Sequence, residues 1–198
     1  MRCPVSDNRN LEVLFNSDDA PQDVLDNDDL LTEDLDERYE TIAKHIGYIV
    51  IHFNALEDLV TLIVSDLTFE RLGDQDERSA VFLSEMTFSQ KASTLMKLYG
   101  LWIRFDDFRR YEDRLNGIGQ RLTESSRRRN QYAHADWLHS ESMKWVKIKT
   151  KVSRQRDRVF HQYRSFDDCD MADDLAYIKQ TSQLLDEFHE EVCQAMLR

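Results

Sequence analysis

Apolar side chains recur every three or four residues along most of the chain, which is the spacing of amphipathic helices. This pattern predicts a first helix over about residues 35–67 and a second one that begins at Thr87. It predicts a third helix over about 106–133 and a last one over about 171–197. Thr87 is followed three residues later by Gln90, which is the arrangement of a capping box at a helix N-terminus.

Before the last helix, over about residues 143–166, the period of the apolar positions changes to two. One face of the predicted strand carries Val146, Ile148, Thr150 and Val152, and the other carries Trp145, Lys147, Lys149 and Lys151. A turn is expected near 154–157, and residues 159–166 can return as a second strand. The sequence therefore predicts a basic β-hairpin inserted between two helices.

Glycine and proline are rare, at 5 and 2 of 198 residues, which argues against a fold that is built from many tight turns. The fold class predicted is mainly α, a helical bundle with the inserted basic hairpin. Residues 1–34 are rich in acids and lack apolar periodicity, so they are expected to form a flexible arm. Residues 35–198 are long enough for one domain with its own core.

The net charge of −12 is unevenly distributed. Residues 1–80 hold 20 acids and 6 bases, and residues 165–198 hold 9 acids and 2 bases. Residues 121–164 hold 12 bases and 4 acids, which gives a local net charge of +8. Because phosphate contacts are local at physiological salt, this basic segment allows nucleic-acid binding by a protein that is acidic as a whole.

Cysteine usage and the N-terminus favour a reducing compartment. The three cysteines are odd in number and widely spaced, so neither a disulfide framework nor a zinc site is expected. The first residues contain no apolar run of a secretory signal. The most apolar stretch carries His52, Asn54, Glu57 and Asp58, which are costly in a bilayer, so it is interpreted as a core helix of a cytoplasmic protein without a membrane span.

One short stretch, RRRNQYAHADW from Arg127 to Trp137, concentrates the candidate chemistry. Arg129 is followed by Asn130, and His134 lies five residues beyond the arginine. A second arginine–histidine pair at this spacing, Arg156/His161, lacks the asparagine and falls on the predicted hairpin.

The position of Arg129 also distinguishes it from other arginines. It lies seven residues beyond Leu122, in line with the apolar stripe of the third helix, so it is predicted to point inward. On one straight helix Arg129 and His134 would lie about 140° apart. Either the helix ends near His134, or a second copy of the chain completes the site.

The segment RNQYAH resembles the R-N-x-x-x-H signature of the HEPN superfamily, and the upstream LSEMTFSQKASTLMKL is similar to the helix that precedes it in that family. The resemblance covers roughly residues 35–198. It implies a HEPN-like helical bundle, often dimeric, and in many members a metal-independent ribonuclease of toxin–antitoxin, phage-defence or RNA-processing systems. Some members are not catalytic. In some toxins a tyrosine two residues after the histidine is modified, but here Ala135 and Asp136 follow His134.

Carried over by motif, the resemblance implies that Arg129 and His134 are catalytic and that Asn130 supports them. The chemistry fits these residue types: histidine can take the 2′-hydroxyl proton, and arginine can stabilise the phosphorane. The products would carry 2′,3′-cyclic phosphate ends. No cofactor is expected, and the spacing of His134, Asp136 and His139 matches no common metal site.

Other residues are candidates with open alternatives. RNA contacts are considered for Arg127, Arg128, Lys147, Lys149 and Lys151, although a solvated surface would explain the same residues. Glu57 and Tyr132 are considered as residues flanking the cleft; for Glu57, as for His52, a partnered polar side chain in the core is the alternative. The expected partners are RNA, a second copy of the chain and an inhibitory protein. The alternative functions are a non-catalytic HEPN-type module that binds RNA, nucleotide or protein, and a helical interaction scaffold.

Overall fold

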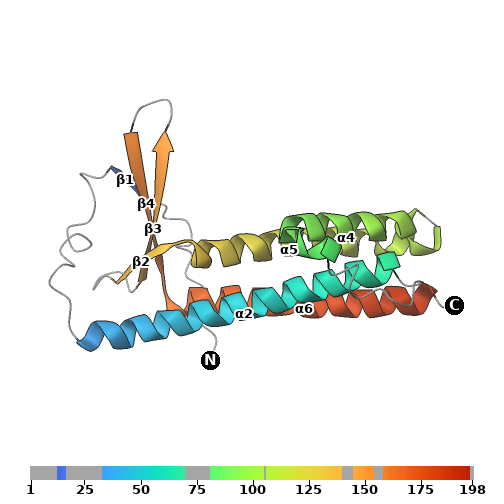
Figure 1. Ribbon diagram of the computed structural model, residues 1–198, viewed down its shortest axis with the longest axis horizontal. Coiled ribbons are helices and arrows are strands. Elements are labelled where there is room, and N and C mark those ends of the chain that lie inside the picture. The colour runs from blue at the N-terminus through green and yellow to red at the C-terminus, as the bar shows by residue number, and fades with distance from the viewer. Residues whose placement is uncertain are drawn as a thin grey trace. The chain divides into compact units, whose positions relative to one another are not determined.

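The computed structural model describes the backbone of residues 13–16, 33–69, 81–104, 106–139, 145–153 and 158–196 (Figure 1). Its fold is mainly α with a β-hairpin before the last helix, as predicted. The helices are α2 (Glu33–Phe69), α4 (Phe88–Ile103), α5 (Glu112–Ala133) and α6 (Asp168–Met196), with a 3-10 helix η3 (Asp106–Tyr111) before α5. The strands are β1 (Val13–Asn16), β2 (Asp136–His139), β3 (Trp145–Ser153) and β4 (Arg158–Phe166).

The chain forms two compact units, each made of two segments. The sheet unit comprises Met1–Gly47 and Gln131–Asp173, and the bundle unit comprises Tyr48–Asn130 and Asp174–Arg198. The predicted division into an arm over 1–34 and one domain over 35–198 stays a prediction. Most of that arm lies outside the described residues.

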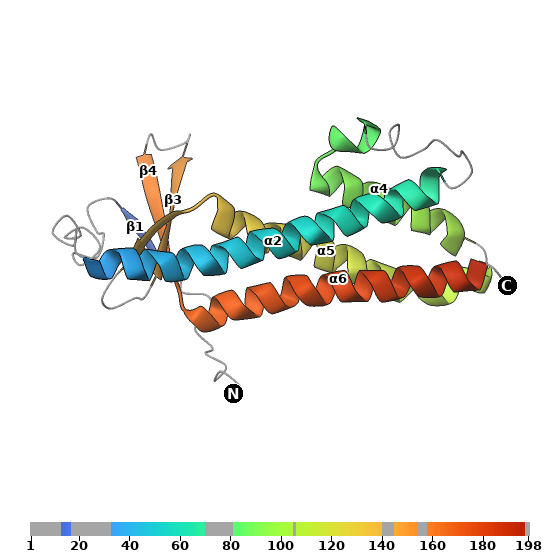
Figure 2. The same cartoon turned by 60° about the horizontal axis from the view of Figure 1, so that its bottom comes forward.

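Four helical segments build the bundle unit, and Figure 2 shows them running along one another. Their core contains buried apolar side chains from every helix, and the predicted stripe of α5 is confirmed. The buried set includes Ile49, Phe53, Leu56, Val60, Ile63, Leu95, Tyr99, Leu115, Ile118, Leu122, Ile178, Leu185, Phe188 and Val192. Tyr99 and His189 join α4 to α6 by a hydrogen bond of 2.8 Å between the hydroxyl and Nδ1.

Local sequence signals explain where α4 begins and how closely it packs. Thr87 caps α4, and the predicted capping box with Gln90 is present. Gly119 of α5 gives room to Met96 of α4, since a Cβ on this glycine would lie 2.8 Å from the methionine Cε. Close helix packing at a glycine of α5 therefore occurs at Gly119, whereas a Cβ on Gly117 would meet nothing within 4 Å.

The sheet unit holds a four-stranded antiparallel sheet in the order β1-β4-β3-β2. The predicted hairpin forms its centre, with Val146 opposite Ser165 and Val152 opposite Val159. The strands β1 and β2 were not predicted; β1 lies inside the segment expected to be a flexible arm. Trp145 and Val146 are neighbours that point to opposite faces, and both are buried, with Trp145 lying 5.7 Å from the ring of Tyr39.

One expectation about cysteine chemistry is wrong. Cys169, at the start of α6, is disulfide-bonded, and its partner lies outside the described residues. Cys193 is not disulfide-bonded. Three widely spaced cysteines gave no pairing signal in the sequence, because pairing depends on the distance between Cα atoms in the fold. Disulfides are rare in the cytosol, so this bond counts against the expected reducing compartment.

One helix in the described part of the chain is long and apolar enough to cross a membrane, namely Tyr39–Thr68 within α2. In the structure 28% of its most apolar window is buried. Phe53, Leu56 and Val60 face the core of the bundle unit, whereas Tyr48, Ile51 and Leu62 are exposed. A core helix of a soluble protein has the same length and composition, so α2 alone assigns no location.

Candidate functional site

Arg129 lies on the face of α5 that points into the bundle unit, as the apolar stripe predicted. Its guanidinium carbon lies 4.4 Å from the centre of the Phe53 ring of α2. Its Nε is buried and has no hydrogen-bond partner. Within the described residues, no carboxylate lies within ion-pair distance of Arg129. A partly desolvated guanidinium with free donors is costly by itself, and an anion that supplied acceptors would relieve that cost.

The Phe53 ring that contacts Arg129 is also packed against α4. Phe88, the first residue of α4, packs on Phe53 with 4.7 Å between ring centres. One turn further along, Lys91 Nζ donates to Glu57 Oε1 at 2.9 Å, and the lysine side chain is only 10% exposed. Phe88 and Lys91, both in the segment TFSQK (Thr87–Lys91), therefore connect α4 to the part of α2 that Arg129 contacts.

Arg127 and Arg128 have partners of their own. Arg127 donates Nε and Nη2 to the two carboxylate oxygens of Glu124 at 2.6 and 2.7 Å. Arg128 donates to Glu124 at 2.8 Å and to Asp174 at 2.6 Å, and it stacks on Tyr177 at 3.9 Å. These hydrogen bonds, first of all those from Arg127, lower the pKa of Glu124 to about 2. Arg128 thus joins α5 to α6 rather than standing free.

The remaining motif residues lie around the end of α5. Asn130 is exposed, and the helix ends at Ala133, so exposed His134 falls in the turn beyond it. On a straight helix Arg129 and His134 would lie about 140° apart, so the sequence left two arrangements open. The observed end of α5 before His134 corresponds to the first of them, a helix that ends near His134. Arg129 and Asn130 belong to the bundle unit and His134 to the sheet unit, so the structure does not place the histidine relative to the arginine.

Tyr132 and Glu57 do not stand open in a cleft. Tyr132 is 2% exposed, stacks on Trp137 at 5.7 Å and packs on Phe166 at 5.5 Å. Glu57 is held by Lys91, in agreement with the alternative of a partnered polar side chain. His52, one residue before Phe53, has its pKa lowered by burial and by the charge of Lys179.

The three hairpin lysines occupy alternate positions of β3. The backbone register pairs Lys147 with Arg164 of β4 on one side and with Trp137 of β2 on the other. Lys149 pairs with Gln162, and Lys151 pairs with Phe160. Two cationic positions, 147 and 164, are therefore direct neighbours across the central strand pair.

Two members of the site were not assigned a role from the sequence. Phe53 falls within the predicted first helix and Lys91 within the upstream LSEMTFSQKASTLMKL segment, but neither was given a role there. A signal was present for Lys91, because a lysine four residues after a helix cap and in line with core residues needs a buried partner. No sequence signal could show that the ring of Phe53 supports Arg129, because that contact joins residues 76 positions apart.

Among the residues whose side chains are described, no three His, Cys, Asp or Glu gather as metal ligands would. Comparisons with protein-family models, with curated proteins and with solved structures found no match for this chain. The site must therefore be interpreted from its own residues.

Proposed function

We propose that the chain is a metal-independent endoribonuclease of the R-N-x-x-x-H type. The observation that supports this proposal most directly is that Arg129 lacks an ion-pair partner among the described residues. In a chain with 38 acidic residues it has no acidic partner among the described side chains, while its neighbours Arg127 and Arg128 are both paired. A guanidinium with unused donors on an aromatic support suits a phosphate group, whose oxygens accept two parallel hydrogen bonds.

In this proposal Arg129 stabilises the negative charge that develops on the phosphorane. Removing one donor of this kind commonly costs about 10²–10³-fold in rate. His134 accepts the proton of the attacking 2′-hydroxyl, a role worth about 10²–10⁴-fold. Asn130, exposed and adjacent to Arg129, orients the imidazole or bonds a phosphate oxygen. The 2′-oxygen bonds to phosphorus as the bond to the 5′-oxygen breaks, so the products carry 2′,3′-cyclic phosphate and 5′-hydroxyl ends.

We also propose a homodimer, because a second His134 would supply the acid that protonates the leaving 5′-oxygen. The paired positions of Lys147 and Arg164, together with Lys149 and Lys151, support RNA contact along the hairpin. A cytoplasmic location and an inhibitory protein partner are further parts of the proposal. The Cys169 disulfide counts against the first of them.

The test is cleavage of end-labelled RNA in EDTA by the wild type, Arg129→Ala and His134→Ala. Each variant is expected to lose at least about 10²-fold in rate. Arg127→Ala is the matched control, because this neighbouring side chain is 56% exposed and should leave cleavage nearly unchanged. A cyclic phosphate end is identified by its resistance to 3′-end ligation until the ring is opened and a phosphatase removes the phosphate.

The outcomes separate the alternatives. RNA binding without cleavage in the wild type would support a non-catalytic binding module. If the wild type neither binds nor cleaves RNA, the remaining alternative is a helical interaction scaffold. Cleavage that needs a divalent ion, or that survives in His134→Ala, would contradict the proposed mechanism.

A further inference from the structure

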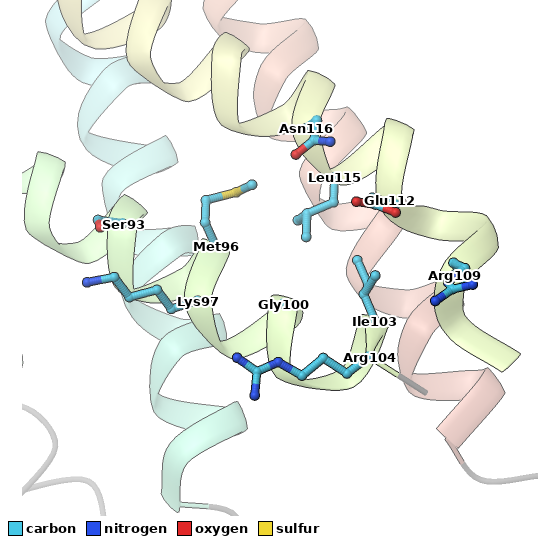
Figure 3. Close-up of a pocket in the computed structure, with 10 residues that line it drawn as sticks. All are labelled: Ser93, Met96, Lys97, Gly100, Ile103, Arg104, Arg109, Glu112, Leu115 and Asn116. Atoms are coloured by element: carbon cyan, nitrogen blue, oxygen red, sulfur yellow. The ribbon is translucent and has the colours of Figure 1, made fainter. Parts of the chain in front are cut away.

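A hollow in the bundle unit lies between the C-terminal half of α4, η3 and the start of α5 (Figure 3). Its volume is about 510 Å³, within the range of about 300–1,000 Å³ that small-molecule sites occupy. An adjoining hollow of about 430 Å³ shares Lys97, Gly100 and Arg104 with it. Neither hollow contains a residue of the R-N-x-x-x-H motif.

The rim of this hollow is cationic in an acidic protein. Lys97, Arg104 and Arg109 line it, and Glu112 is the one acid among its lining residues. Within the described residues, Lys97 and Arg104 have no carboxylate at ion-pair distance. Several other cations of this unit are paired, as Lys91 is with Glu57 and Arg114 is with Glu191. Lys97 of α4 and Arg104, seven residues later at the C-cap of this helix, provide a site for an anion.

The floor of the hollow is apolar. Its apolar lining residues are Met96, Ile103 and Leu115, and Figure 3 shows Asn116 and Glu112 on the α5 side and the Arg104 guanidinium near Gly100. Thioether and aliphatic groups suit the face of a planar ring, and the amide of Asn116 can donate to and accept from its edge. An inorganic anion would use the rim and leave this floor empty.

We infer that this hollow binds a nucleoside phosphate, with the phosphates at Lys97 and Arg104 and the base on the floor. The chemistry is the same for a free nucleotide and for a terminal nucleotide of an RNA strand. The inference does not depend on the proposed cleavage, because no residue of the R-N-x-x-x-H motif lines the hollow and the binding of ADP is measured without RNA.

Two kinds of variant remove the site in different ways. Lys97→Gln combined with Arg104→Gln removes the charge. Gly100→Leu adds a side chain at a residue that lines the hollow, and a Cβ at Gly100 meets nothing within 4 Å. Lys179→Gln is the control, since it removes a cation of the same unit that does not line the hollow. Circular dichroism and melting temperature show whether each variant is folded.

The experiment is isothermal titration of the full chain with ADP, adenosine, inorganic pyrophosphate and a five-nucleotide RNA. We expect ADP or the RNA to bind at least tenfold more tightly than adenosine or pyrophosphate, and each site variant to weaken that binding at least tenfold. Lys179→Gln should bind as the wild type does. Tighter binding of ADP identifies a free nucleotide as the ligand, and tighter binding of the RNA identifies a strand end.

Three results would overturn the inference. The first is no binding of either ADP or the RNA. The second is pyrophosphate binding as tight as that of ADP, which would indicate a plain anion site. The third is unchanged binding in both the charge variant and Gly100→Leu; if Gly100→Leu proves unfolded, the surface charge variant alone decides.

Discussion

At the scale of single residues, three adjacent arginines have three different environments. Arg127 pairs with Glu124 near the surface, and Arg128 is held between Glu124 and Asp174. Arg129 rests on Phe53 and has no acid partner among the described residues. Because successive side chains of a helix are rotated by about 100°, the three face different neighbours although their chemistry is identical. The helix geometry therefore determines which arginine has no acidic partner among the described residues.

The support of Arg129 can be tested by comparing Phe53→Leu with Phe88→Leu. Both variants remove the Phe53–Phe88 ring contact and a similar apolar volume, so each should lower the free energy of unfolding by about 1–2 kcal/mol. Only Phe53→Leu removes the ring beneath the guanidinium, a contact worth about 0.5–2 kcal/mol. RNA cleavage should therefore fall about 3–30-fold in Phe53→Leu and change little in Phe88→Leu. An equal loss of RNA cleavage in both variants would show that the Phe53 ring affects cleavage only through the stability of the fold.

At the scale of helices and strands, the sequence predicted what depends on local pattern. The four long helices follow from apolar periodicity, the start of α4 from its capping box, and the hairpin from alternation. The two four-residue strands were missed, because β1 forms only by pairing with β4, about 150 residues later. The inward direction of Arg129 was predictable from its stripe, but the binding of Arg128 to Asp174 was not, since nothing local links them.

Glu124 forms two ion pairs within α5, with Arg127 and Arg128, and their contribution to stability depends on pH. The folded-state pKa of about 2 lies below the usual 4.5, so the folded chain binds this proton more weakly than the unfolded chain. The pairs therefore stabilise the fold above about pH 4.5, and this contribution is lost as the pH falls from 4.5 towards 2. Glu124→Gln should lower the free energy of unfolding by roughly 1 kcal/mol at pH 7.

Urea unfolding at several pH values checks this prediction. The difference in the free energy of unfolding between the wild type and Glu124→Gln should become smaller as the pH drops below 4.5. Glu190→Gln is the control, because this exposed carboxylate of α6 forms no ion pair among the described residues, so its effect should stay within about 0.5 kcal/mol. A difference that stayed constant with pH would mean that the charge of Glu124 is not what stabilises the fold.

At the scale of the whole molecule, charge is separated along the chain. The acidic segment before α2 and the basic segment over 121–164 have opposite signs, and β1 lies within the first of these segments. Our hypothesis is that the acids shield the basic surface until RNA or a partner displaces them. Deleting residues 1–34 is a poor test, because it also removes β1 and leaves the edge of β4 unpaired.

A charge-matched pair of variants tests shielding without removing the strand. Asp26→Asn, Asp28→Asn and Asp29→Asn together change the net charge from −12 to −9, and so do Asp186→Asn, Glu187→Gln and Glu190→Gln on α6. If the N-terminal acids shield the basic surface, the first triple variant should bind RNA several-fold more tightly than the second at low salt. The gap should close as added salt screens the charges, since the Debye length falls to about 8 Å at 0.15 M. If the two triple variants bind RNA with equal affinity at low salt, RNA affinity depends only on net charge. The N-terminal acids would then have no specific role in RNA binding.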